Sequence, residues 1–303
     1  MRGFFGLVRR NLLMYFKDIS AVVFSLLTSI IVFVLYLLFL KGNYVDAIEA
    51  SAKGLETFIQ SGDIDMLVTG ILLVGILGSA LITVPYSTII GIVRDKETGV
   101  SDDILVTPLK RRLIAAAYFI SAAICSFIMV SFIATISFVL IGLTGDLHMA
   151  PGAILATYGI ILLGSVSSTS LFMLVVTSFK STAACNAFFG ILSAAAGFVI
   201  GAFIPISGFS TTVQTICCLF PASHVTVLLR HSLLNGIVEK INTDIGGVDG
   251  GAFASAIKET FTFELPFMGK NLTPWNSAAI ACACVVVFSV LCMVVYSKTY
   301  KRK

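Results

Sequence analysis

The sequence predicts an all-α polytopic membrane protein, built as a single transmembrane domain over residues 1–303. Hydrophobic residues make up 57% of the chain and charged residues only 12%, whereas soluble domains carry about 25% charged residues. A water-soluble fold cannot bury this much apolar surface, so lipid must be the solvent for much of the chain. Six segments reach the roughly 20 mostly apolar residues that a membrane-crossing helix needs. They comprise residues 19–40, 66–93, 113–143, 152–179, 184–204 and 276–297.

Residues 1–18, which precede the first span, are expected to form an interfacial amphipathic helix. At about 100° per residue, Arg2, Arg9, Arg10 and Lys17 fall in one arc, and most of the remainder is apolar. Such a helix lies in the membrane interface with its basic side toward the headgroups and the cytosol. It either only anchors the first span or also helps to dock a cytoplasmic partner, and the two roles are compatible.

The distribution of charge orients the chain. The segments before span 1, between spans 2 and 3, between spans 4 and 5 and after span 6 carry 14 basic and five acidic residues, against six basic and 11 acidic residues on the opposite side. The positive-inside rule places the first set in the cytoplasm. We therefore expect a multi-pass protein of the plasma (inner) membrane with both termini cytoplasmic.

The spans themselves are uncharged, because every Lys, Arg, Asp and Glu falls in a connection or at the edge of a span. Proton-driven carriers usually keep an acid or base within the membrane as a relay. The energy for any pumping is therefore expected to come from outside the membrane.

The connection between spans 2 and 3, residues 94–112, is expected to contain a short cytoplasmic helix. Gly99 permits a tight turn before it. Ser101 can cap the helix, with Asp102 and Asp103 favourably placed in its first turn.

The end of this short helix is predicted at Thr107, because the residue before a proline disfavours helical geometry. Thr107 and Pro108 then suit the cap and first position of span 3. Ile104 and Leu105 give the short helix an apolar side. Either the connection is an ordinary solvated loop, or a protein partner covers that side.

The apolar stretch between spans 5 and 6, residues 205–235, is interrupted by Pro205, Gly208 and Pro221. Pro221 lies too late to start a span and too early to end one. A re-entrant helical segment, broken near the surface, fits better than a seventh crossing. Residues 236–275 are expected to form an extracellular loop, either a plain surface excursion or a contact for cargo.

Small residues mark two of the spans as sites of close helix packing. Ser193, Gly197 and Gly201 recur every four residues, and Gly75 and Gly78 give span 2 a similar side. Such stripes allow helices to approach closely in lipid. They pack either within one subunit or along a dimer seam or transport pathway.

Motifs for chemistry are absent from the sequence. There is no G-x-x-x-x-G-K-[ST] phosphate loop, H-E-x-x-H or G-x-S-x-G. His148, His224 and His231 are scattered, and the seven cysteines are expected to be small buried apolar side chains. We expect no catalytic or metal site, and no nucleic-acid partner, because no basic tract interleaves with aromatics.

The stretch "RDKETGVSDDILVTPLKRRLIAAAYFISA" resembles the cytoplasmic connection of type-2 ABC exporter permeases. That pattern is an arginine, a glutamate, a glycine, a short helix, a proline and a basic start to span 3. The matching residues are Arg94, Glu97, Gly99, Pro108 and either Arg111 or Arg112. The family usually has threonine where this chain has Val100.

A second stretch, "FIPISGFSTTVQTICCLFPASHVTVLLR", resembles the segment that follows span 5 in the same family. Pro205, Pro221 and Arg230 take the places of its two prolines and closing arginine. The family often has another proline near Thr212, which is absent here. Together with the N-terminal helix and the six spans, the resemblance covers essentially the whole chain.

The resemblance implies a half-transporter that works as an exporter. An uncharged route suits a hydrophobic or amphiphilic cargo, such as a drug, lipid or peptide. The short helix would be a coupling helix seated in a separate ABC-type ATP-binding subunit, and the re-entrant segment would close the exit. Two permeases, identical or homologous, and two ATP-binding subunits would form the working unit in membrane lipid. This chain would be no enzyme and bind no cofactor itself, with ATP and Mg on the partner. The implied coupling residues are Arg94, Glu97, Gly99, Asp102, Asp103, Ile104, Leu105, Pro108 and Arg112.

Two other classes of function were weighed against this one. A secondary carrier or channel without an ATPase partner remains the alternative, since sodium coupling through backbone carbonyls needs no intramembrane charge. An intramembrane enzyme is disfavoured, because no acid, histidine pair or metal cluster lies within a span.

Overall fold

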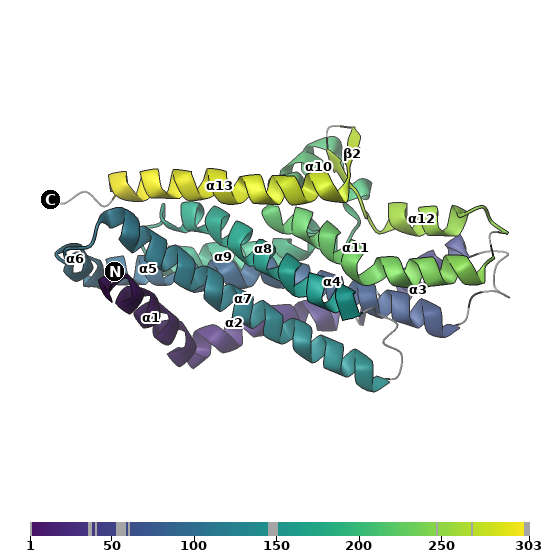
Figure 1. Ribbon diagram of the computed structural model, residues 1–303, viewed down its shortest axis with the longest axis horizontal. Helices are drawn as coiled ribbons and strands as arrows, with labels where there is room; N and C mark the ends of the chain where they lie inside the picture. Colours follow the sequence, from purple (N-terminus) through teal and green to yellow (C-terminus); the bar gives the residue numbers. More distant parts are fainter. Residues whose placement is uncertain are drawn as a thin grey trace.

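A computed structural model describes residues 2–35, 38–39, 41–52, 59, 61–144, 151–246, 248–267 and 269–299. Most of these residues are helical, and the long helices run along one axis of the molecule (Figure 1). The elements in chain order are α1 (Arg2–Lys17), α2 (Ile19–Leu35), α3 (Lys41–Ser51), α4 (Ser61–Ile89), α5 (Gly91–Glu97), α6 (Val100–Leu105), α7 (Arg111–Thr144), α8 (Pro151–Val176), α9 (Thr182–Val199), η2 (Ile206–Gly208), α10 (Thr211–Cys218), α11 (Pro221–Asp244), α12 (Ala252–Thr260), β1 (Leu265–Phe267), β2 (Lys270–Leu272) and α13 (Pro274–Thr299).

Five helical segments of the described chain are long and apolar enough to cross a membrane. They are α4 with α5, α7, α8, α9 and α13, which coincide with predicted spans 2 to 6. The number rises to seven if each of two bent helix pairs counts as one span. The pair α1–α2 bends by 68° and the pair α10–α11 by 88°. Predicted span 1 corresponds to α2, and its residues 36, 37 and 40 lie outside the described chain.

The segments that the charge pattern placed on one side of the membrane gather at one end of the molecule. In Figure 1, α1, α5, α6 and the last turns of α13 lie at the left-hand end, whereas α3, α12 and the end of α11 lie at the right-hand end. This arrangement agrees with a single cytoplasmic end. We call the end that carries α6 the inner end and the opposite one the outer end.

The core is built around α4, which packs against α2, α7, α8, α9 and α11 and is buried over most of its length. Glycine makes the contact with α11 close. A Cβ atom on Gly78 would lie 2.5 Å from the Thr226 hydroxyl oxygen, and one on Gly70 would lie 2.5 Å from the Leu234 side chain. Gly75 is also buried. The small-residue side of α4 therefore serves packing within this chain.

The small-residue stripe of α9 likewise packs against its own chain, where the backbone reverses direction after Val199. A Cβ atom on Gly197 would lie 2.3 Å from the Phe203 ring. Gly201 has φ +68°, and a Cβ there would lie 2.8 Å from the Ile206 side chain. Only glycine suits this position, because other residues rarely adopt such a φ. The turn also ends α9 at Val199, whereas span 5 was predicted to end at residue 204.

The stretch predicted to be re-entrant contains η2, α10 and the first part of α11, and the bend of 88° between α10 and α11 fits either a re-entrant segment or a broken span. Pro205 immediately precedes η2, and Pro221 is the first residue of α11, where a missing N–H costs nothing. The helix α11 continues to Asp244, so the predicted boundary at residue 235 is wrong. Hydropathy falls there, but Leu233, Ile237 and Ile241 still supply one buried side at helical spacing.

The predicted extracellular loop, residues 236–275, contains regular secondary structure. It holds the end of α11, then α12, and a two-stranded antiparallel sheet in which Leu265 pairs with Leu272. The Asp249 carboxylate accepts hydrogen bonds from the backbone N–H groups of Phe253 at 2.8 Å and Gly251 at 3.0 Å. These bonds to the charged form lower the pKa of Asp249.

Arg230 joins three separate segments near the chain reversal. Its side chain is buried within α11, and its guanidinium donates to the backbone carbonyls of Thr262 at 2.8 Å, Ile200 at 3.0 Å and Gly201 at 2.9 Å. Hydrogen bonds from a charged donor are stronger than neutral ones. Arg230 therefore fixes the turn after α9 and the segment before β1 onto α11.

We expect Arg230→Met to lower the unfolding free energy of the purified protein by about 3 kcal/mol, because three buried carbonyls lose a charged donor. The measurement is denaturant unfolding in detergent, followed by circular dichroism. The matched control is Lys270→Met, which removes a charge from an exposed position of β2. Equal stability of the two variants would contradict the role assigned to Arg230.

Candidate functional site

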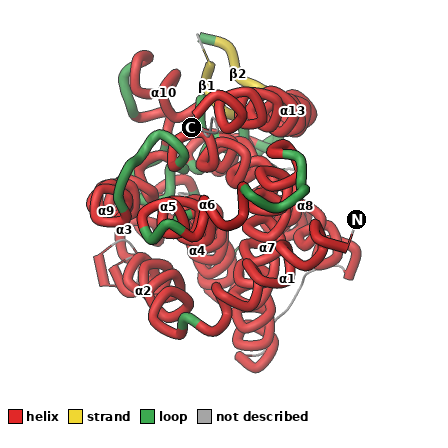
Figure 2. Tube along the Cα trace, turned by 90° about the vertical axis from the view of Figure 1, so that its left-hand side faces the viewer, coloured by secondary structure: helices red, strands yellow, loops and turns green. Residues whose placement is uncertain are grey.

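The connection between α4 and α7 lies at the inner end of the molecule and forms two short helices, α5 and α6 (Figures 1 and 2). Gly99 has φ +81° and separates them, which confirms the predicted turn. Gly99, and not Ser101, precedes the first residue of α6, and no side chain caps that helix. Gly99 lets α6 begin at Val100. Ser101 therefore lies inside α6, where it is buried. Asp102 and Asp103 occupy the first turn, as predicted.

The end of α6 lies close to its predicted position, but Thr107 and Pro108 do not begin the next helix. The Thr107 hydroxyl donates to the Ile104 carbonyl at 2.6 Å and so completes the end of α6. Pro108 is exposed in the turn, and α7 begins three residues later at Arg111. Arg112 is exposed in its first turn. The prediction that Thr107 caps α7 is wrong, because its hydroxyl binds the C-terminal end of α6.

The apolar side of α6 is partly covered by this chain. Ile104 and Leu105 are half-buried against the main core, so this chain itself covers part of the apolar side for which the sequence suggested solvent or a protein partner. Val106 is the exposed apolar side chain, at 71%. The exposed surface at this end therefore includes Val106 and the acidic first turn of α6.

Glu97 links the last residue of α5 to the first residue of α9. Its Oε2 atom accepts the Thr182 backbone N–H at 2.9 Å and the Thr182 hydroxyl at 2.6 Å. The Ser181 hydroxyl accepts the Ala184 N–H at 3.3 Å and caps the same helix. A carboxylate at a helix N-terminus is stabilised by the unpaired N–H groups and the helix dipole. Glu97 thereby couples the position of α5 to that of α9.

Asp95 holds α1 against α5 and α7. It is only 2% exposed, and its two oxygens accept from both terminal nitrogens of Arg10, at 2.7 and 2.8 Å. The Tyr118 hydroxyl, on α7, donates to the same carboxylate. Arg10 therefore does not face the headgroups as the helical wheel predicted. A fork of two parallel bonds is the strongest geometry available to this pair.

A second ion pair lies nearer the surface, where Arg94 donates to Asp18 at 2.9 Å. Arg94 was predicted to hold the membrane edge, and its side chain is 57% exposed. Asp18 lies between α1 and α2, at their bend, so the pair ties this bend to α5. Exposed pairs of this kind contribute little to stability.

Sequence reasoning missed Arg10, Asp95, Tyr118 and Thr182 as members of this site. The only signal was the charged pair Arg94–Asp95 beside an apolar span. Their partners stand 76 and 85 residues away along the chain, and nothing local indicates which acid meets which base.

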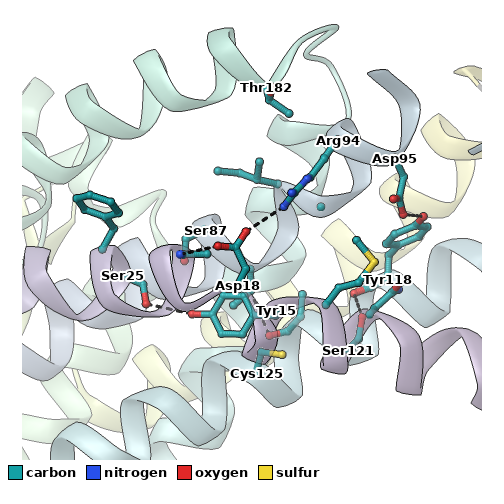
Figure 3. A pocket seen from close by; sticks show the side chains of 18 of the residues that line it. Tyr15, Asp18, Ser25, Ser87, Arg94, Asp95, Tyr118, Ser121, Cys125 and Thr182 are labelled. Carbon is teal, nitrogen blue, oxygen red and sulfur yellow. Dashed lines mark hydrogen bonds and ion pairs between the residues drawn. The ribbon is translucent and has the colours of Figure 1, made fainter. Parts of the chain in front are cut away.

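A cavity of about 390 Å³ lies beneath the α1–α2 bend (Figure 3). It is enclosed by α1, α2, the end of α4, α5, α7 and the start of α9. Tyr15 and Ser25 share a hydrogen bond of 3.0 Å in its wall. We call it the bend cavity.

The other predicted sites lie apart from the inner end. Pro205, Pro221 and Arg230 belong to the re-entrant segment, and Ser193 is half-buried in α9. Among the residues that the structure describes, no three His, Cys, Asp or Glu side chains form a metal site. Cys282 is exposed, contrary to the expectation of buried cysteines.

The histidines that can be placed bond to backbone. His224 pairs with the Cys218 carbonyl at 2.8 Å and His231 with the Phe263 carbonyl at 2.9 Å. His148 lies outside the described residues.

We expect Asp95→Asn to release α1, because Arg10 would lose its counter-ion. The cost is about 2 kcal/mol, less than for a fully buried pair since the Arg10 side chain is 31% exposed. Tryptic cleavage within residues 9–17 of the solubilised protein should become about thirtyfold faster. Asp18→Asn, which breaks only the exposed pair, serves as the control, and an equal effect of both variants would contradict the role of Asp95.

Comparison with known proteins identifies the family of the chain. A search of curated proteins finds no match. The family model described as "ABC-2 family transporter protein" matches residues 50–296, which include α5, α6 and the re-entrant segment. The match covers most of the chain, and the chain belongs to the ABC-2 family of transporter proteins.

Proposed function

We propose that this chain is the membrane-spanning permease subunit of an ATP-driven exporter. Membership of the family supports a permease of an ABC transporter and association with an ABC ATP-binding subunit. The working unit would contain two such subunits and a second permease, identical or homologous. It would lie in the plasma membrane with both termini cytoplasmic. The observation that carries the proposal is the contact of Glu97 with Thr182.

In the proposed mechanism, force enters at α6. Its exposed Val106 and acidic first turn would contact the ATP-binding subunit. Displacement of α6 pulls on α5 through Gly99, and Glu97 transmits the movement to the N-terminus of α9. Because α9 packs against α4, a shift at its inner end changes the contact between these two helices.

A second route leads from α5 to α1. Asp95 binds Arg10, so any movement of α5 carries the amphipathic helix with it. The helix α1 would then move within the membrane interface while α9 moves in the core. This chain would bind no nucleotide, and ATP and Mg would act on the partner subunit.

The proposed cargo is hydrophobic or amphiphilic, such as a drug, lipid or peptide. By family resemblance α9 would line the route, and it carries no charged residue between Thr182 and Val199. The resemblance also implies α4, which is uncharged between Met66 and Ile89 but is largely covered by the other helices of this chain. Ile191 and Phe198 are exposed on α9 and available to a second permease or to cargo.

The experiment is reconstitution with the cognate ATP-binding subunit in lipid vesicles. We expect Glu97→Gln to reduce transport per ATP hydrolysed about fivefold or more, the range of an ordinary coupling free energy. Thr182→Val should act in the same direction, and more weakly because its N–H remains. The double variant should be no worse than Glu97→Gln alone, since both remove one interaction.

The matched control is Glu239→Gln, an exposed acid at the outer end of α11. Unchanged transport in Glu97→Gln would remove the coupling role of this contact. Labelling of thiols introduced at residues 101–106 from the outside of intact cells would overturn the permease orientation as a whole.

A further inference from the structure

We propose that the bend cavity binds the headgroup of a zwitterionic amphiphile from the inner leaflet of the membrane. The inference deepens the proposed function and rests on it, because an amphiphilic cargo would first meet the permease here. It is carried by the lining of the cavity, its charges and an exposed apolar side chain in its wall.

The cavity is lined by polar side chains that the fold has already buried. Tyr15, Ser25, Ser121 and Tyr118 are each less than a tenth exposed. Asn11 also lines the cavity, and its buried side-chain Nδ2 atom has no hydrogen-bond partner in the described chain. The lining therefore offers buried hydroxyl and amide side chains to a polar ligand, and the Asn11 Nδ2 atom itself is covered by protein.

The charges in the lining are balanced. Asp95 is neutralised by Arg10, which leaves Arg94 and Asp18 to face a ligand. Figure 3 shows these two side chains pointing toward one another and joined in the ion pair of 2.9 Å. Their pair is half-exposed and costs little to open. A phosphate would replace Asp18 on the Arg94 guanidinium, and an ammonium would replace Arg94 on the Asp18 carboxylate.

Aromatic rings favour the positive end of such a headgroup. Tyr15, Phe24, Tyr118 and Phe189 all line the cavity. Quaternary ammonium groups bind the faces of aromatic rings when several surround them. An anionic headgroup would meet the Asp18 carboxylate without compensation, so the zwitterion fits better.

One wall of the cavity carries an exposed apolar side chain of α2. Phe24 lines the cavity and is 62% exposed, beside Val23 at 50%. Exposed apolar residues on a transmembrane helix contact hydrocarbon. A chain attached to the bound headgroup can therefore leave past Phe24 into lipid, which makes the ligand an amphiphile and not a free headgroup.

The test uses the full-length chain in nanodiscs of anionic phosphatidylglycerol, without ATPase or nucleotide. The probes are photoactivatable lysophosphatidylcholine, which is zwitterionic, and its anionic lysophosphatidylglycerol counterpart. Saturable labelling within residues 14–25 and 87–94 is expected, with the zwitterion binding about tenfold more tightly than the anion. Soluble glycerophosphocholine should compete poorly.

Three variants identify the groups responsible. Asp18→Asn should remove the preference for the zwitterion, whereas Arg94→Gln should weaken both probes about tenfold. Ala21→Phe, which fills the cavity without changing charge, should abolish saturable labelling. Lys41→Gln, at the opposite end of the molecule, is the control and should label like the unaltered chain.

Absence of saturable labelling, an unchanged preference in Asp18→Asn, or full labelling of Ala21→Phe would overturn the proposal and leave the cavity to water. Equal competition by soluble glycerophosphocholine would overturn the requirement for a tail. The preference of the unaltered chain tests the idea even if a variant fails to fold. Because no ATPase is present, failure here leaves the permease assignment standing, and failure of ATPase binding leaves this site standing.

Discussion

The buried carboxylate of Asp95 is the interaction on which the inner end of the molecule depends. A charge removed from water is tolerated only when its hydrogen-bonding capacity is filled, and Arg10 and Tyr118 fill it from two other helices. The same short helix presents Glu97 to α9. Two acids separated by one residue thus attach α5 to α1 and α7 on one side and to α9 on the other.

In the outer half of the molecule a positive charge, that of Arg230, holds separate segments together, as the negative charge of Asp95 does at the inner end. Arg230 binds three backbone carbonyls of the chain reversal and the segment before β1. Its partners are dipoles, whereas those of Asp95 include a full charge. Arg230 thus ties the outer turn together, as Asp95 and Glu97 tie the inner end. The bend cavity lies at that inner end, between the helices that α5 connects.

The apolar spans are held together by close packing and contain few charged side chains. In lipid, polar backbone groups are satisfied within helices, and close packing between them falls to small residues such as Gly78 and Gly197. Apart from Arg230, the charged side chains discussed here lie near the helix ends, where Lys240 also pairs with the buried Asp63 at 2.7 Å. The proposed coupling contact and the bend cavity both lie where the helices leave the apolar core.

The sequence by itself determined the class of protein, five of the span positions, the turn at Gly99 and the break at Pro221, because hydropathy, glycine and proline act locally. Sequence reasoning misplaced the start of α7, because the Thr107 hydroxyl completes α6. It also misplaced the end of α11, because a stripe of buried apolar side chains continues that helix beyond residue 235. Tertiary structure alone decided that Arg10 meets Asp95, that Glu97 meets Thr182 and that a cavity forms beneath the α1–α2 bend. Such pairings join residues more than 80 positions apart, and only the packing of the helices brings them within hydrogen-bonding distance.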